Sequence, residues 1–131
     1  MMSLPQLMVV DDDDDIREAM DLALGAEGYV VTTAADGVAA WALLQGGAQP
    51  DLILLDLMMP RWDGEQLLTA LADSEHASIP VIVMSGHDSG AKRARALGAV
   101  AILPKPVDLE TLLATVARHC QSHEGKVAKH L

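Results

Sequence analysis

Five short apolar runs alternate with amphipathic segments along the 131-residue chain, and this alternation limits the possible folds more than any other feature. The runs lie at residues 7–10, 29–33, 52–55, 80–84 and 100–103. Continuous apolar character over so few residues is typical of strands that are covered on both faces. A (βα)5 alternation predicts one α/β domain with a parallel sheet, right-handed crossovers and helices on both faces of the sheet.

The segments between the runs carry helical spacing and helix-end signals. The first opens with the capping-box arrangement Asp15-Ile16-Arg17-Glu18 and ends near Gly28, and later helices are expected to begin near residues 36, 64, 88 and 109. The last helix has apolar residues at the spacing of a buried face, namely Leu109, Leu112, Leu113, Val116, Ala117 and Cys120. Four histidines show no spacing typical of a metal site and are expected at the surface, namely His76, His119, His123 and His130.

The formal net charge of −10 is unevenly distributed and excludes some functions. Residues 1–75 carry 15 acids and two bases, whereas residues 76–131 carry four acids and seven bases. An acidic half disfavours direct nucleic-acid binding, which depends on basic patches. No apolar stretch approaches the roughly 20 residues of a membrane span, no leader pattern precedes the first run, and Cys120 is the single cysteine. We therefore expect a cytoplasmic protein that contacts neither membrane nor nucleic acid.

Acidic residues directly follow two of the expected strands. A run of five aspartates, which begins with Asp11 and Asp12, follows the first strand, and Asp56 closes the third. Because binding sites gather at the carboxyl ends of parallel strands, these carboxylates are expected to converge if the two strands are neighbours. Oxygen ligands with excess negative charge suit Mg²⁺. One carboxylate can then attack phosphorus, while Ser85 and Lys105, at the ends of the fourth and fifth strands, hold the phosphoryl oxygens.

The aspartate run also allows other interpretations. Its alternate positions match the first ligands of an EF-hand loop, but Ile16 stands at the sixth position instead of Gly and Leu22 at the twelfth instead of Glu, so a calcium hand is not expected. Residues 13–15 are expected to lead into the first helix, whose dipole favours carboxylates at this end. A shift of one residue would make Asp12 and Asp13 the strand-end pair in place of Asp11 and Asp12.

Four motifs, in order along the chain, closely resemble the receiver domains of two-component response regulators. They are Val9–Asp13, Asp56–Gly64, Val83–Gly86 and Leu103–Pro106. The resemblance spans residues 5–121 and leaves 122–131 as a C-terminal tail that is expected to be frayed. It implies a flavodoxin-like fold with five parallel strands in the order 2-1-3-4-5.

The resemblance also implies site roles. Asp56 matches the phospho-acceptor, Asp11 and Asp12 match the acidic pair that holds Mg²⁺, and Met58 matches the residue that supplies a backbone carbonyl to the metal. His87 and Met58 occupy places that border the path of attacking water, which makes both candidates for tuning phosphoryl lifetime.

Ser85 and Lys105 match the hydroxyl and the lysine that contact the phosphoryl group, and the Lys105–Pro106 bond is expected to be cis. The implied partners are a histidine kinase or phosphotransfer protein, and a downstream target protein or effector domain. Such a receiver helps catalyse its own phosphorylation and dephosphorylation but is not an enzyme that turns over a metabolite. The phosphorylated form is expected to switch the surface formed by the fourth helix, fifth strand and fifth helix.

Some residues depart from the family pattern or keep other functions open. Ile102 stands where the fifth strand usually carries an aromatic residue, so reorientation of an aromatic ring is excluded as the output signal, and Val107 and Asp14 replace a common Phe and Pro. Ile102 alone favours the alternative function, a phosphorylation-independent interaction module. An aspartyl-phosphate hydrolase would need a cap insertion, and no segment is long enough.

Two surface features have further possible roles. The basic cluster 92–95 is a candidate docking surface or simply solvates the fourth helix. The fluorescence of Trp62 is expected to change when Mg²⁺ binds.

Overall fold

The computed structural model describes residues 4–58, 63–86 and 88–120. Within them, strands and helices alternate along the chain as the apolar runs predict. The elements are β1 (Gln6–Val10), α1 (Asp14–Ala26), β2 (Val30–Ala34), α2 (Gly37–Gln45), β3 (Leu52–Asp56), α3 (Gly64–Ala72), β4 (Val81–Ser85), α4 (Asp88–Ala96), β5 (Ala101–Pro104) and α5 (Leu109–His119). None of these helices is long and apolar enough to cross a bilayer.

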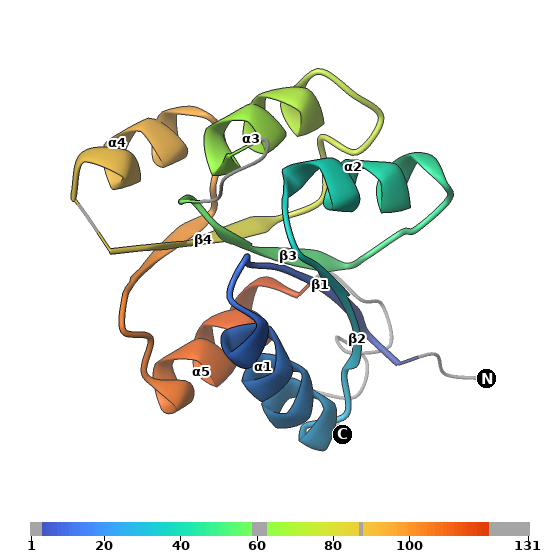
Figure 1. Cartoon of the computed structure of the whole chain (residues 1–131), viewed down its shortest axis with the longest axis vertical. Coiled ribbons are helices and arrows are strands. Elements are labelled where there is room, and N and C mark those ends of the chain that lie inside the picture. The colour runs from blue at the N-terminus through green and yellow to red at the C-terminus, as the bar shows by residue number, and fades with distance from the viewer. Residues whose placement is uncertain (1–3, 59–62, 87, 121–131) are drawn as a thin grey trace.

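All five strands are parallel and form one sheet in the order β2-β1-β3-β4-β5, which confirms the expected flavodoxin-like fold. Figure 1 shows α2, α3 and α4 on one face of the sheet and α1 and α5 on the other. The order places β1 beside β3, so the carboxyl ends of these two strands lie next to each other. The acids at the ends of β1 and β3 can converge because these two strands are neighbours in the sheet.

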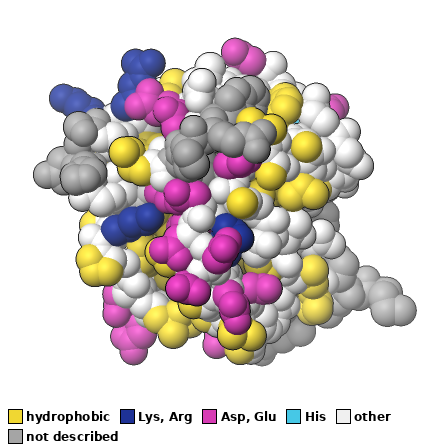
Figure 2. Space-filling view, in the orientation of Figure 1, with side chains coloured by type: hydrophobic (Ala, Val, Ile, Leu, Met, Phe, Trp, Pro, Cys, Tyr) yellow, Lys and Arg dark blue, Asp and Glu magenta, His cyan; other side chains and the backbone are white. Residues whose placement is uncertain are grey.

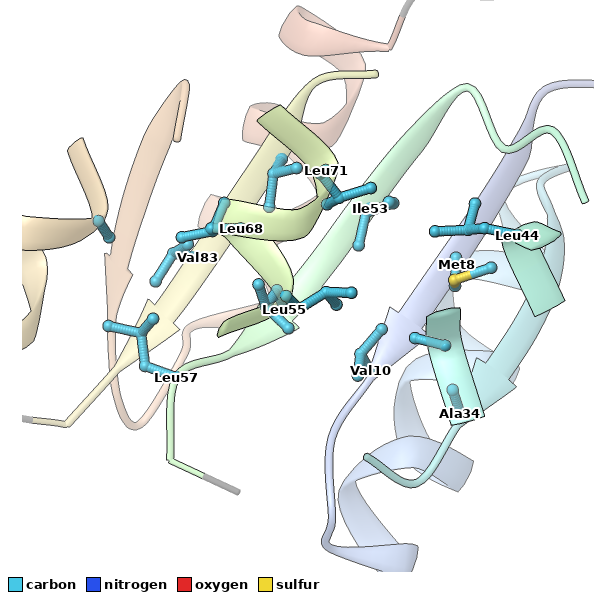
Figure 3. Packing of buried hydrophobic residues seen from close by; sticks show 14 residues of the cluster. Met8, Val10, Ala34, Leu44, Ile53, Leu55, Leu57, Leu68, Leu71 and Val83 are labelled. Carbon is cyan, nitrogen blue, oxygen red and sulfur yellow. The ribbon is translucent and has the colours of Figure 1, made fainter. Parts of the chain in front are cut away.

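The three central strands are apolar on both faces because helices cover both sides of the sheet. Met8 and Leu55 point into the cluster beneath α2, α3 and α4, which Figure 3 shows. Val9 and Leu54, one residue along each strand, point into the second cluster against α1 and α5. Since successive strand residues face opposite sides, a continuous apolar run gives each helix layer its own core.

The two outer strands differ from the expectation that every apolar run is covered on both faces. In β2 only Ala34 is buried, and in β5 only Leu103 is buried. Each of these strands has a single neighbour in the sheet, so the helices that span the centre cover it incompletely. The apolar runs predicted the strands correctly and overestimated their burial at the edges.

The N-cap of helix α1 lies two residues earlier than the capping-box pattern predicts. Asp13 is its N-cap, because the Asp13 carboxylate accepts hydrogen bonds from the backbone N–H groups of Asp15 (2.9 Å) and Ile16 (3.2 Å). The expected capping box at Asp15 is therefore wrong, although the expectation that this part of the acid run leads into the helix is correct. A reciprocal capping box forms instead at α3, between Asp63 and Gln66.

Two further expectations about burial are wrong. Leu109, expected on the buried stripe of the last helix, is 52% exposed at the start of α5, while Leu112 and Val116 are buried as expected. The His76 side chain, expected at the surface, is only 11% exposed and packs edge-on against Trp41, with ring centroids 6.0 Å apart. This contact joins the segment between α3 and β4 to α2, which sequence spacing alone does not reveal.

Candidate functional site

Three carboxylates converge where β1 and β3 end. Asp11, Asp12 and Asp56 each offer an oxygen, and these oxygens all lie within 4.8 Å of one another. Asp11 and Asp56 are buried, whereas Asp12 is exposed. The sequence predicted this set of three, and the adjacency of β1 and β3 brings them together. Asp13, the alternative member of the acid pair, instead caps α1.

Asp11 is held by several hydrogen bonds, none of which involves its second carboxylate oxygen, Oδ2. Its N–H donates to the Ala34 carbonyl at 3.1 Å, and its Oδ1 accepts from the Asp13 N–H at 2.9 Å. Within the described part of the chain, Asp11 Oδ2 is buried and has no hydrogen-bond partner. A buried anionic oxygen without a donor is costly unless a cation lies beside it. The carboxylate oxygens grouped here are therefore suitable ligands for a divalent cation that prefers oxygen, such as Mg²⁺.

The Asp56 carboxylate lies between the acidic pair and a lysine. Its Oδ1 accepts from the Met58 N–H at 3.1 Å and lies 3.1 Å from Lys105 Nζ. The same Nζ is 3.8 Å from Asp11 Oδ2. Lys105 thus contacts both buried acids and offsets part of their repulsion.

The end of β5 is anchored to the end of β4 beside this lysine. The Lys105 N–H donates to the Ser85 carbonyl at 2.9 Å, and the Lys105–Pro106 bond is cis, as expected. Ser85 is buried at the last position of β4, which lies beside β3 in the sheet. All the strand-end residues that the sequence selected therefore belong to one edge of the sheet.

Figure 2 shows Asp and Glu side chains gathered over this part of the surface, with Lys or Arg side chains beside them. The Met58 side chain is exposed at the same edge, two residues after Asp56. His87 and Trp62, which the sequence analysis also singled out, lie outside the described residues.

Burial raises the pKa of the Asp11 carboxyl above its ordinary value. The hydrogen bond from the Asp13 N–H opposes this rise, the charge of Asp56 adds to it, and Lys105 opposes it. The charge of Asp12 makes a smaller contribution that again raises the pKa. In the metal-free protein the ionised form of Asp11 is thus poorly accommodated.

This raised pKa predicts how stability depends on pH. The folded state binds the Asp11 proton more tightly than the unfolded state, so this contribution to stability is present at low pH and lost as the pH rises through the folded-state pKa. In EDTA at neutral pH, we expect Asp11→Asn to raise the Tm by roughly 2 to 6 °C. The difference in Tm between the variant and wild type should become smaller as the pH is lowered. A variant that melts below wild type at neutral pH would contradict this prediction.

Gly64 allows α3 to begin close to the end of β3. A Cβ at Gly64 would lie 2.7 Å from Leu57 Cα and 3.0 Å from the Asp56 carbonyl oxygen. The Gly64 N–H donates to the Leu57 carbonyl at 3.0 Å, which holds the two segments together. The Asp-Gly pair signals the turn, but the contact with Leu57 depends on the packing of α3 against the sheet.

We expect Gly64→Ala to destabilise the protein by about 1 to 3 kcal/mol, because the neighbouring backbone atoms cannot move aside. Urea denaturation gives the free energy of unfolding. Gly25→Ala in α1 is the matched control, because a Cβ there meets no atom of the described residues within 4 Å. The control is expected to be neutral or slightly stabilising. An equal decrease in the free energy of unfolding in the two variants would show that the close approach to Leu57 does not cause the destabilisation.

Sequence and structure comparisons point to one family. The family profile described as "Response regulator receiver domain" matches residues 7–117. The chain is 41% identical over 111 residues to "Response regulator MprA" of Mycobacterium sp. (strain KMS), which covers 83% of this chain and 47% of that relative. The Mycobacterium ulcerans protein of the same name is 40% identical over the same length. The chain thus spans about half the length of the curated relatives it matches.

Solved structures agree over most of the chain. The fold is similar to the Vibrio cholerae chemotaxis protein CheY4, with a TM-score of 0.82, 32% identity, and coverage of 89% of this chain and 99% of that one. A response regulator receiver protein from Pseudomonas putida gives a TM-score of 0.84 at 33% identity, covering 90% of this chain and 99% of that one.

Proposed function

The chain belongs to the response regulator receiver domain family, and on that premise we propose that Asp56 accepts the phosphoryl group in a phosphorelay. One observation carries this assignment. The Asp56 carboxylate is buried at a sheet edge, within reach of two other acids and 3.1 Å from Lys105 Nζ. This arrangement combines a nucleophile, oxygen ligands for a metal and a cation for phosphoryl oxygens.

The proposed transfer is a single in-line displacement. A carboxylate oxygen of Asp56 attacks the phosphorus of a partner's phosphohistidine, an O–P bond forms and the N–P bond breaks. The electron pair of the broken bond remains on the imidazole nitrogen. Lys105 and the Ser85 hydroxyl are proposed to contact the phosphoryl oxygens, since both lie at the same sheet edge. The receiver itself thereby contributes to its own phosphorylation and hydrolysis and turns over no metabolite.

Asp11, Asp12 and Asp56, with the backbone carbonyl of Met58, are proposed to hold Mg²⁺. The buried Asp11 Oδ2, which lacks a hydrogen-bond donor among the described residues, supports a cation at this position. When bound, Mg²⁺ neutralises the negative charge that gathers as a phosphoryl group approaches three carboxylates. Without that neutralisation, repulsion between like charges would oppose the approach.

Membership of the family implies interaction with a kinase and with a downstream effector. We propose a histidine kinase or phosphotransfer protein as the donor, and a downstream target protein or effector domain as the receiver of the signal. Helix α4 is the proposed start of the output path, because it packs directly on the site. A Cβ on its Gly90 would lie 2.8 Å from Leu57 Cδ1 and 3.6 Å from Ser85 Oγ.

Ile102 is a half-buried residue of β5 that packs against the cluster beneath α2, α3 and α4. It supplies no aromatic ring for the output, so the proposed switch of the α4-β5-α5 surface proceeds through aliphatic packing. The alternative of a phosphorylation-independent module is not favoured, because the acids and Lys105 converge in one site.

Phosphorylation by a small donor tests the proposal directly. The protein is incubated with acetyl phosphate in Mg²⁺ or in EDTA, and its intact mass is measured. We expect an added mass of one phosphoryl group in Mg²⁺ and little or none in EDTA. An unmodified mass in Mg²⁺ would count against Asp56 as an acceptor, and equal labelling in EDTA would count against the metal.

A further inference from the structure

Arg17 is a mostly buried cation that the proposed phosphotransfer does not use. It lies on the first turns of α1, and its side chain is 18% exposed. Its Nη1 donates to the backbone carbonyl of Asp11 at 2.7 Å, and its Nη2 pairs with the Asp14 carboxylate. The guanidinium therefore bridges the end of β1 and the start of α1, across the loop that carries the metal-ligand acids.

This bridge adds to the contacts that hold Asp11 in place. The Asp11 N–H is bonded to Ala34, its Oδ1 to the Asp13 N–H and its carbonyl to Arg17. Asp11 Oδ2 is then the carboxylate oxygen left without a donor in the described part of the chain. These hydrogen bonds restrain Asp11 at its backbone N–H, its carbonyl and Oδ1. Its Oδ2 remains available to a cation.

We propose that Arg17 is a positioning residue for the divalent cation site. Three carboxylates held close together repel one another, and a loose loop would relieve that repulsion by moving Asp11 and Asp12 apart. The Arg17 guanidinium fixes the Asp11 backbone before any cation arrives. Residues that hold the ligands of a metal contribute to its affinity without touching it. This inference rests on the proposed metal site and extends it to a residue of α1.

The geometry favours arginine over lysine at this position. A guanidinium presents several N–H donors in one rigid plane, so it can bond the Asp11 carbonyl and the Asp14 carboxylate together. The ammonium of a lysine is a point charge on a flexible stem and cannot reproduce this paired geometry. The charge of Arg17 and its positioning role can therefore be separated by substitution.

Simple charge effects and positioning predict opposite results. Removing a cation beside the acid run makes the site more negative, so a purely electrostatic role predicts tighter Mg²⁺ binding in Arg17→Gln. Positioning predicts weaker binding, with a Kd raised about tenfold. Arg17→Lys keeps the charge, so electrostatics alone predicts no change, whereas loss of the paired bonds predicts a Kd several-fold above wild type.

Isothermal titration of Mg²⁺ into the metal-free protein measures these constants without any phosphodonor. The matched control is Arg93→Gln, which makes the same charge change at an exposed arginine of α4 that pairs with Glu65. The control is expected to bind Mg²⁺ as tightly as wild type. Thermal unfolding in EDTA shows whether each variant is folded. If Arg17→Gln does not fold, the Kd of Arg17→Lys alone tests the inference.

The outcomes separate this inference from the proposal on which it rests. Weaker binding in both Arg17 variants, with an unchanged control, supports it. A wild-type Kd in folded Arg17 variants overturns it, even if their Tm falls, because such variants would show a role in stability alone. A wild-type protein that binds no Mg²⁺ overturns the metal site and this inference together.

Discussion

Replacing Asp56 with asparagine is expected to abolish phosphoryl incorporation from acetyl phosphate. The amide of asparagine is nearly isosteric with the carboxylate and keeps an acceptor for the Met58 N–H, but it lacks the anionic oxygen that attacks phosphorus. Intact-mass measurement in Mg²⁺ should show the added phosphoryl group in wild type and none in Asp56→Asn. The unmodified variant should retain its fold, since the substitution removes one of three negative charges that lie close together.

The matched control is Asp73→Asn, which makes the same chemical change at an exposed residue just after α3. It should be labelled like wild type. Labelling of Asp56→Asn at the wild-type level would move the acceptor to another residue. Loss of labelling in Asp73→Asn as well would point to a general effect of charge instead of a role for Asp56.

The second large effect is expected for Lys105→Met. Lys105 Nζ lies 3.1 Å from the Asp56 carboxylate and 3.8 Å from Asp11, so it is placed to contact a phosphoryl group attached to Asp56. Methionine keeps much of the aliphatic stem and removes the charge. Loss of one preorganised donor at a site of developing charge typically slows the chemical step by two to three orders of magnitude. We expect the rate of phosphorylation by acetyl phosphate to fall about 100-fold.

A time course of intact mass at fixed Mg²⁺ measures this rate. Lys92→Met, at an exposed position of α4, is the matched control and should react at the wild-type rate. A rate for Lys105→Met within a few-fold of wild type would remove Lys105 from the phosphoryl site. Because the substitution leaves Asp56 in place, slow labelling is expected here, in contrast to the complete loss expected for Asp56→Asn.

The acid run shows how far local patterns predicted the site. The motif order selected Asp11 and Asp12, yet a shift of one residue would have selected Asp12 and Asp13. The structure assigns Asp13 to the N-cap of α1 and groups Asp11, Asp12 and Asp56 within 4.8 Å. Neighbouring side chains in an extended segment point in different directions, so a single-residue shift changes which acids meet.

Burial at the margins of the fold was predicted less well than burial at its centre. The apolar runs of β2 and β5 resemble those of the central strands, but their places at the two edges of the sheet leave most of their residues incompletely covered. His76 gave no sequence signal of burial because its partner, Trp41, lies 35 positions earlier, in α2. These features depend on which segments pack together, and sequence periodicity carries no information about that.

The sequence by itself determined the order of strands and helices, the family resemblance, and the residues that stand at the strand ends. It could do so because periodicity and helix-end signals are properties of short segments. Only the tertiary structure decided that Asp11 keeps a buried oxygen without a donor among the described residues, that Arg17 reaches back to its carbonyl, and that Gly64 must remain without a side chain beside Leu57. The physical reason is that each of these depends on distances between segments that the fold brings together.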